Sequence, residues 1–228
     1  SIVLASVCLV LSQSPVALGA IAIVGVGALA LFGLRRIAPD AQRFWQFGLL
    51  AAALVTTVLA WVFRTQLIAV LDASRDLEYR LNLWRRVWDL LSLHSLEGWG
   101  WVGAWRLELV PYVGFRSFPG GAPDSAANAF LDVWLQLGIV GLAAFVVLLL
   151  LAFVRSWLLA VQRRSVVFAW PALVLLALVV TSLAESSILG EFGLLTLVVC
   201  TVKASRELSW RQAFASAPVK PELPRERA

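Results

Sequence analysis

Long apolar runs separated by short polar segments make up most of the chain. The five clearest runs cover residues 16–34, 44–63, 130–154, 167–183 and 188–202. In a helix, about 20 apolar residues cross the ~30 Å hydrocarbon core of a bilayer. The runs are continuous and lack the alternation of barrel strands, so helices are the expected spanning elements. The pattern predicts an all-α fold, a multi-pass transmembrane helical bundle.

The chain begins inside a further apolar run. Residues 1–11 are hydrophobic, with no initiator Met and none of the basic residues that open a signal peptide. We therefore expect residues 1–13 to be the end of a spanning helix whose beginning is missing. The chain would then be the C-terminal portion of a larger multi-pass protein.

Basic residues mark one side of this bundle. Arg35, Arg36 and Arg43 lie in the short loop 34–43, and the loop after residue 154 and the tail are also rich in Arg or Lys. Short loops of this kind stay in the cytoplasm, so all three segments are expected there. Helices counted between them place the segment 64–128 and the turn around residue 185 on the exoplasmic side.

The exoplasmic segment is the longest polar part of the chain. Apolar residues recur in its first half at spacings of four and three, which predicts an amphipathic helix at about 77–93. They are Leu77, Leu81, Trp84, Trp88 and Leu91. The second half is rich in Gly, Pro and Trp and is expected to be a structured loop. Five indoles suit the membrane–water interface, along which we expect the segment to lie; they are Trp84, Trp88, Trp99, Trp101 and Trp105.

These patterns divide the chain into four parts. Residues 1–63 hold transmembrane helices, the first one truncated, with the cytoplasmic loop 34–43, and residues 64–128 form the exoplasmic loop. Residues 129–202 hold three transmembrane helices. The tail 203–228 has mixed charge and three Pro residues, and is expected to be cytoplasmic and disordered.

Composition agrees with a membrane protein and narrows the chemistry. Of the 228 residues, 61% are hydrophobic and 14% charged, whereas soluble domains are about half apolar and about a quarter charged. The formal net charge of +5 follows from the cytoplasmic loops, so no nucleic-acid partner is expected. His94 is the single His, and Cys8 and Cys200 lie in apolar runs. We expect no metal site, no disulfide and no cofactor.

A polar stripe opens the run at 130–154. Asn128, Asp132 and Gln136 stand four residues apart, so in a helix they share one face. Asp124 or Ser125 is the expected N-cap of that helix. In a straight spanning helix Gln136 would lie about 6 Å deeper than Asp132. Polar groups at such depth either serve a site or fix packing by interhelical hydrogen bonds, and the pattern leaves both readings open.

Arginines of the predicted amphipathic helix supply a second half to this candidate site. Arg80, Arg85 and Arg86 lie on it together with Trp84. A guanidinium binds phosphate oxygens through two parallel hydrogen bonds, so an Arg- and Trp-rich roof suits an anionic lipid headgroup. For any one Arg, nonspecific contact with membrane phosphate is the plainer alternative.

Several short motifs resemble the O-antigen ligase/polymerase family. They are Arg-Leu-Asn-Leu-Trp at 80–84, Gly-Trp-Gly-Trp at 98–101, Asn-Ala-Phe-Leu-Asp at 128–132, Leu-Gly-Ile-Val-Gly-Leu at 137–142 and Leu-Ser-Gln-Ser at 11–14. Their order and the long loop between two helices fit as well. The resemblance covers about residues 11–191, which correspond to the C-terminal half of a typical member.

This resemblance implies a membrane glycosyltransferase of the bacterial cytoplasmic membrane, active in surface polysaccharide biosynthesis. Members transfer a glycan from a polyprenyl-diphosphate carrier, without a metal, to a lipid or glycan acceptor on the exoplasmic face. By its place in the Arg-x-x-x-Trp motif, Arg80 is implied to bind the diphosphate. Arg85, Arg86, Trp84 and Asn128 are the further substrate-binding candidates.

Two positions depart from the family pattern. The family often has His, a general base, immediately before the residue matching Asn128, and Arg after the Leu-Ser-Gln-Ser run; here these are Ala127 and Pro15. A carboxylate would then have to act as the base, and Asp132 and Glu185 are the candidates. The alternatives are a catalytically impaired member that binds lipid-linked glycan or scaffolds polysaccharide export, and an unrelated transporter. A transporter predicts inverted repeats and broken helices, which the sequence does not show.

Overall fold

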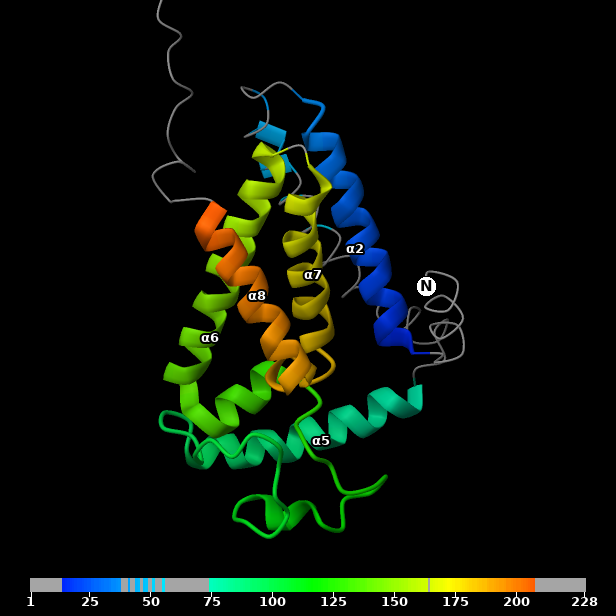
Figure 1. Ribbon diagram of the computed structural model, residues 1–228. Helices are drawn as coiled ribbons and strands as arrows, with labels where there is room; N and C mark the ends of the chain where they lie inside the picture. Colours follow the sequence, from blue (N-terminus) through cyan, green and yellow to red (C-terminus); the bar gives the residue numbers. More distant parts are fainter. Residues whose placement is uncertain are drawn as a thin grey trace, which may run out of the picture.

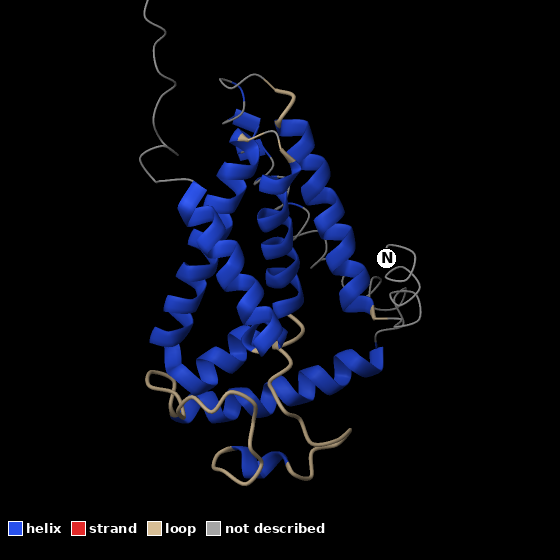
Figure 2. Ribbon diagram, in the orientation of Figure 1, coloured by secondary structure: helices blue, strands red, loops and turns tan. Residues whose placement is uncertain are grey.

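The computed structural model describes residues 14–37, 74–163 and 165–207, with scattered positions between 41 and 55. Its regular structure in these residues is entirely helical, which confirms the all-α prediction (Figure 2). The expected spanning helices at 1–13 and 44–63 and the end of the tail fall largely outside the described residues. The elements are α2 (Pro15–Leu34), α5 (Ser74–Leu93), η1 (Tyr112–Phe115), α6 (Ala129–Gln162), α7 (Val166–Ser182), η2 (Ser187–Leu189) and α8 (Glu191–Glu207).

Helix α7 is the centre of the described bundle and packs against α2, α6 and α8 (Figure 1). One apolar cluster joins the end of α2, through Leu31 and Leu34, to small residues of α6 and α7. A second joins α6, α7, η2 and α8. Small side chains such as Ala160 and Ala172 are fully buried there, which lets the helix backbones approach closely.

The outer surface of this bundle is apolar. Leu29 of α2, Val140 of α6 and Phe192 of α8 are 75%, 72% and 82% exposed. An apolar patch of this extent is unusual on a protein surrounded by water and suits lipid. Helices α2 and α6 are long and apolar enough to cross a membrane, and α7 is apolar but shorter. Helix α8 continues to Glu207, so residues 203–207, which were expected in the disordered tail, are helical.

Helix starts follow from local capping chemistry. The hydroxyl of Ser14 accepts a 3.3 Å hydrogen bond from the backbone N–H of Ala17, and Pro15 occupies the first turn of α2, where its missing N–H costs nothing. Ser165 caps α7 in the same way, accepting from the N–H of Val167 at 3.4 Å. Polar residues at the ends of apolar runs therefore set where these helices begin.

Helix α6 is bent at Gly138, whose φ of 68° and ψ of −173° are not helical. The run at 130–154, expected as one spanning helix, is therefore two limbs. The long limb, residues 139–162, measures about 36 Å at 1.5 Å per residue and is long enough to cross a bilayer alone. The short limb, residues 129–137, lies at the end of the bundle beside α5 (Figure 1). The polar stripe sits on this short limb, so Gln136 does not continue along the spanning axis below Asp132 as a straight helix would require.

Helix α5 lies across the end of the bundle, and the loop that follows it projects farther from the bundle (Figure 1). Its buried face consists of Leu83, Val87 and Leu91, which pack against aromatic residues of the loop. Leu81 and Trp88, members of the predicted apolar stripe, are instead 41% and 57% exposed. The helix thus has apolar residues on two faces, and the loop covers only one of them.

Candidate functional site

The bend in α6 is joined to the loop after α5. Bending at Gly138 deprives the carbonyls of Leu135 and Gln136 of their helical partners, and two loop N–H groups replace them. Trp99 donates to Leu135 and Gly100 to Gln136, both at 2.9 Å. A Cβ added to Gly98 would lie 2.5 Å from the Gly138 nitrogen, and one added to Gly138 would lie 1.9 Å from the Leu96 oxygen. Both glycines also have positive φ, so the two backbones meet at a point that admits no side chain.

Gln136 fixes the same loop a few residues later. Its side-chain oxygen accepts hydrogen bonds from the backbone N–H groups of Val102 and Gly103, at 2.8 and 3.1 Å. Its side-chain nitrogen donates to the carbonyl of Gly103 at 3.0 Å. An amide is the side chain that supplies both an acceptor and a donor at one place. Gln136 therefore attaches the loop and leaves little of its polar capacity for a substrate.

Asp132 occupies the middle of the stripe and is 2% exposed. One carboxylate oxygen accepts from the indole N–H of Trp105 at 2.7 Å. The other accepts from the backbone N–H of Ala126 at 3.0 Å and from the hydroxyl of Ser186. The carboxylate thus joins the loop, the start of α6 and the turn after α7. Burial raises the pKa of Asp132 above its usual value, and the three hydrogen-bond donors oppose that rise.

The phenol of Tyr112 lies in the aromatic cluster around Trp105, whose ring centroid is 5.1 Å from its own. Burial, with a smaller contribution from the charge of Asp132, raises the pKa of Tyr112 to about 12. The residue is 1% exposed, and its hydroxyl has no hydrogen-bond partner among the described residues. Tyr112 therefore serves this cluster mainly as an apolar ring.

Asn128 is the N-cap of α6. Its side-chain oxygen accepts from the backbone N–H groups of Phe130 and Leu131, at 3.0 and 3.1 Å. The prediction that Asp124 or Ser125 would cap this helix is therefore wrong, because the chain enters α6 only at residue 128. The side-chain nitrogen of Asn128 donates to the carbonyl of Leu183 at 3.0 Å, which ties the turn after α7 to the start of α6.

Arg80 reaches, from α5, the place where the turn after α7 meets the start of α6, which we call the junction. Its guanidinium donates to Asp76 at 2.8 Å, to the carbonyl of Ala127 at 3.4 Å and to the carbonyl of Ala184. One turn along α5, the indole of Trp84 donates to the carbonyl of Ala126 at 2.9 Å. The structure therefore brings together Arg80, Trp84 and Asn128, around a cluster of backbone carbonyls from two turns.

Arg85 and Arg86 do not join this group. Successive residues of a helix are turned by 100°, so positions five and six after Arg80 point away from its face. Both side chains are exposed, and Arg85 donates to Asn82 on its own helix at 3.3 Å. These two candidate substrate contacts lie on the other side of α5 from Arg80.

Glu185 follows Ala184 directly and is exposed at the edge of the junction. Its backbone N–H donates to Thr181 at 2.8 Å and closes the end of α7. Asp132, by contrast, is enclosed and has both oxygens engaged. The two carboxylates predicted as bases thus differ in access. Glu185 is exposed next to Ala184, whose carbonyl accepts from Arg80, whereas Asp132 is buried and holds the loop and the turn after α7 against α6.

Ala127 has φ of 47°, in the left-handed region that alanine rarely adopts. It lies between the backbone carbonyl bonded by Trp84 and the N-cap Asn128, and its own carbonyl accepts from Arg80. His and Asn are enriched in this backbone region. The position at which the resemblance leads one to expect a His is therefore one whose geometry also suits that residue better than Ala.

His94 lies away from this junction, in the corner where α5 ends. Its Nδ1 is 2.8 Å from a carboxylate oxygen of Glu97, and its ring stacks edge-on against Trp99 at 4.3 Å. The hydrogen bond with His94 lowers the pKa of Glu97. In the described part of the chain, no three His, Cys, Asp or Glu side chains come close enough to hold a metal ion.

Sequence reasoning missed two partners of Asp132. Trp105 was expected at the membrane interface but is 5% exposed, and Ser186 had no expected role. Trp99 is likewise engaged, donating to the carbonyl of Leu90 at 3.1 Å. No local signal identifies these partners, because they come from segments on either side of α6 in the sequence.

The sequence model of the O-antigen ligase family matches residues 1–146, which is more than half of the chain. The chain belongs to the O-antigen ligase family. The matched region of this O-antigen ligase family member includes α5, the loop and the whole polar stripe, and it ends within α6, before Glu185. The suspected family is thereby confirmed. No curated protein and no solved structure matches the chain.

Proposed function

We propose that this family member transfers a glycan from a polyprenyl-diphosphate carrier to a glycan or lipid acceptor, as a ligase or a polymerase, without a metal. The observation that supports this best is the position of Arg80. Its guanidinium lies where α5, the start of α6 and the turn after α7 meet, inside the region that matches the family. Membership in the family supports a role in polysaccharide biosynthesis and an enzymatic activity of this type.

The proposed orientation follows from charge and from the apolar surface. Helices α2, α6, α7 and α8 span the bacterial cytoplasmic membrane, with α5 and its loop on the exoplasmic face and the C-terminus in the cytoplasm. Basic residues at the opposite end of the bundle then lie in the cytoplasm, in agreement with the rule for short loops. In this orientation the junction around Arg80 lies at the height of exoplasmic headgroups, where the diphosphate of a polyprenyl carrier resides.

Arg80 is the residue to which we assign the diphosphate. Negative charge builds on the departing diphosphate oxygen as the glycosidic bond to the carrier breaks, and a fixed guanidinium stabilises that charge. Trp84 and Asn128 hold the backbone on either side of Ala127, so we assign them to positioning Arg80 and the start of α6. Arg85 and Arg86 remain predicted substrate contacts, which would have to be made by a part of the substrate on the other side of α5.

Glu185 is the carboxylate that we assign as general base. A base must reach the proton that it removes from the acceptor hydroxyl, and Glu185 is exposed beside the Arg80 contact. Asp132 is buried and both of its oxygens already accept hydrogen bonds, so taking a proton would weaken the contacts that it makes. We therefore assign it to positioning the loop and the turn that carries Glu185.

A second candidate function has its own support. The guanidinium of Arg80 donates to three protein acceptors, and the residue before Asn128 is Ala. A catalytically impaired member that binds lipid-linked glycan, or scaffolds polysaccharide export, is consistent with both. Such a protein would bind the donor and show no turnover.

Transfer of radiolabelled lipid-linked oligosaccharide in proteoliposomes tests the proposal. The wild-type protein is expected to transfer label, and Arg80→Gln is expected to lose at least 100-fold, about 3 kcal/mol of transition-state stabilisation. Arg106→Gln, which removes an exposed charge from the loop, is the matched control and should keep the wild-type rate. Donor binding without turnover in the wild type would favour the second candidate, and an active Arg80→Gln variant would contradict the assignment of the diphosphate to Arg80.

A further inference from the structure

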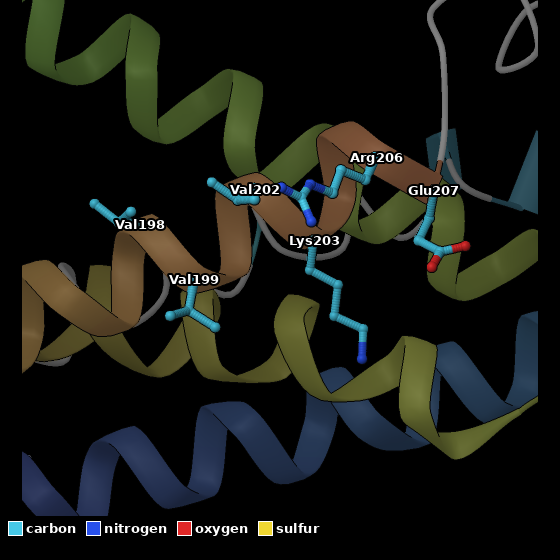
Figure 3. Close-up of a pocket in the computed structure, with 6 residues that line it drawn as sticks. All are labelled: Val198, Val199, Val202, Lys203, Arg206 and Glu207. Carbon is cyan, nitrogen blue, oxygen red and sulfur yellow. The ribbon is translucent and has the colours of Figure 1, made fainter.

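A groove lies at the end of the bundle opposite α5, along the last turns of α8 (Figure 3). Three valines of α8 line its apolar part, which we call the floor, and three charged side chains line the rest. The lining residues are Val198, Val199, Val202, Lys203, Arg206 and Glu207. A second hollow, lined by Val166, Val167 and Trp170 of α7, adjoins it, and Lys203 borders both. The two hollows therefore form one surface between the start of α7 and the end of α8.

Lys203 holds a positive charge between these hollows. Its side chain extends from α8 over α7 (Figure 3), and its ammonium lies 6.0 Å from the centroid of the Phe168 ring. Among the described residues, no carboxylate lies within salt-bridge distance of this ammonium. The groove lining has two cations and one carboxylate, so it carries net positive charge.

The surroundings add to this charge. The first turn of α7, capped by Ser165, presents the positive end of its helix dipole at the second hollow. Arg36 is exposed at the same end of the bundle. Trp170 is 46% exposed beside Lys203, in the position that indoles favour at a membrane surface.

We propose that this groove binds an anionic phospholipid of the cytoplasmic leaflet. Its phosphate would lie against Lys203 and Arg206, and an acyl chain would run over Val202 and Val199 toward the middle of the bundle. Basic pockets between spanning helices on the cytoplasmic side are suited to such headgroups. A soluble anion would use the cations and leave the valine floor uncovered, whereas a lipid covers both. The inference rests on the proposed membrane orientation and is independent of glycan transfer.

Native mass spectrometry of the full chain, released from micelles that contain equal amounts of phosphatidylglycerol and phosphatidylcholine, tests this inference. The wild type is expected to retain phosphatidylglycerol in preference. Lys203→Gln and Arg206→Gln should each lower that preference about fivefold, because a basic residue near the surface is worth about that factor. Arg163→Gln, which removes an exposed cation at the same end outside the groove, should leave it unchanged.

Two further variants keep the outcome decisive. Val199→Trp fills the floor while keeping both cations, and it should lower phosphatidylglycerol retention if the acyl chain lies there. Arg80→Gln, which should lose glycan transfer, should retain the lipid normally, so the two proposals fail separately. Equal retention of both lipids by the wild type, an unchanged preference in Lys203→Gln, or displacement of the lipid by inorganic phosphate would overturn the inference.

Discussion

The indole of Trp105 donates a 2.7 Å hydrogen bond to the buried carboxylate of Asp132. This contact connects the loop after α5 to the short limb of α6. The same carboxylate reaches Ser186 in the turn after α7, so one side chain aligns three segments that lie far apart in the sequence. The polar stripe that opens α6 is therefore the attachment of the loop, and the exposed groups around it are left for chemistry.

Replacing Asp132 by Asn should destabilise the attachment of the loop and of the turn after α7 to α6. The amide would turn a donor NH₂ toward either the Trp105 indole or the Ala126 N–H, and one buried donor would lose its acceptor. The expected loss is about 2 kcal/mol in the free energy of unfolding, from the usual cost of an unsatisfied buried group. Denaturant unfolding in detergent, followed by Trp fluorescence, measures it. Trp105→Phe, which removes the same hydrogen bond from the other side, should lose a similar amount, and a wild-type midpoint in both variants would contradict the role given to this contact.

Replacing Glu185 by Gln should separate chemistry from stability. The side chain is exposed, so the free energy of unfolding should stay within about 0.5 kcal/mol of the wild type. Glycan transfer should nevertheless be abolished, because the amide cannot accept the proton of the acceptor hydroxyl. The assay is transfer of labelled lipid-linked oligosaccharide in proteoliposomes, with insertion checked separately. Full transfer in both Glu185→Gln and Asp132→Asn would rule out a carboxylate base.

Gly138→Ala should be among the most damaging single changes in the described chain. A Cβ there would lie 1.9 Å from the Leu96 oxygen, and the φ of 68° is unfavourable for Ala. Backbone and steric strain together should cost about 3 kcal/mol or more. Gly25→Ala in α2 is the control, because a Cβ there meets nothing within 4 Å and the change should stay within about 1 kcal/mol. Thermal unfolding in one detergent compares the two, and equal midpoints would show that the bend tolerates a side chain.

The raised pKa of Tyr112 predicts that the protein loses stability at alkaline pH. Its pKa is raised to about 12 in the folded protein, whereas an unfolded Tyr titrates near 10. The unfolded state therefore loses this proton first, so the contribution of Tyr112 is full below about pH 10 and is lost as pH rises toward 12. Tyr112→Phe should remove this part of the alkaline loss. It should also be neutral or slightly stabilising at pH 7, because the hydroxyl has no partner among the described residues. Denaturant midpoints at about pH 7 to 11 measure both effects, and identical pH profiles for the two proteins would contradict the assignment.

The apolar runs of the sequence predict much of the helical architecture. Continuous hydrophobic stretches predict α2 and α7 closely, because the polar residues at their ends also cap them. The bend in α6 could not be predicted in this way. A lone Gly in an apolar run is ordinarily helical, and at Gly138 the backbone of Leu96 and Glu97 occupies the space that a side chain would need. This tertiary contact leaves no local pattern in the sequence.

The candidate site could likewise be predicted only in part from the sequence. Spacing identified Asn128, Asp132 and Gln136 as one stripe, and the family motif identified Arg80 and Trp84. The sequence could not predict the contacts of these three residues. Their partners are chiefly backbone groups of distant turns, which any sequence could supply. Without the family motif, residue spacing alone could not distinguish Arg80 from Arg85 and Arg86 in function, because the loop packed against Leu83 and Val87 decides which face of α5 meets α6.

Ala127→His tests directly whether this junction is an enzyme with an altered base. His tolerates the left-handed backbone at this position better than Ala does, so the variant should fold with little loss of stability. If His takes over proton removal, transfer should require neutral imidazole and rise as pH increases through about 6.5. The wild type has no imidazole at this position and should lack this rise. Rates of labelled transfer measured across this range separate the two bases. Combining Ala127→His with Glu185→Gln should restore transfer if the base is all that Glu185 supplies, and an inactive double variant would show that Glu185 also positions the acceptor.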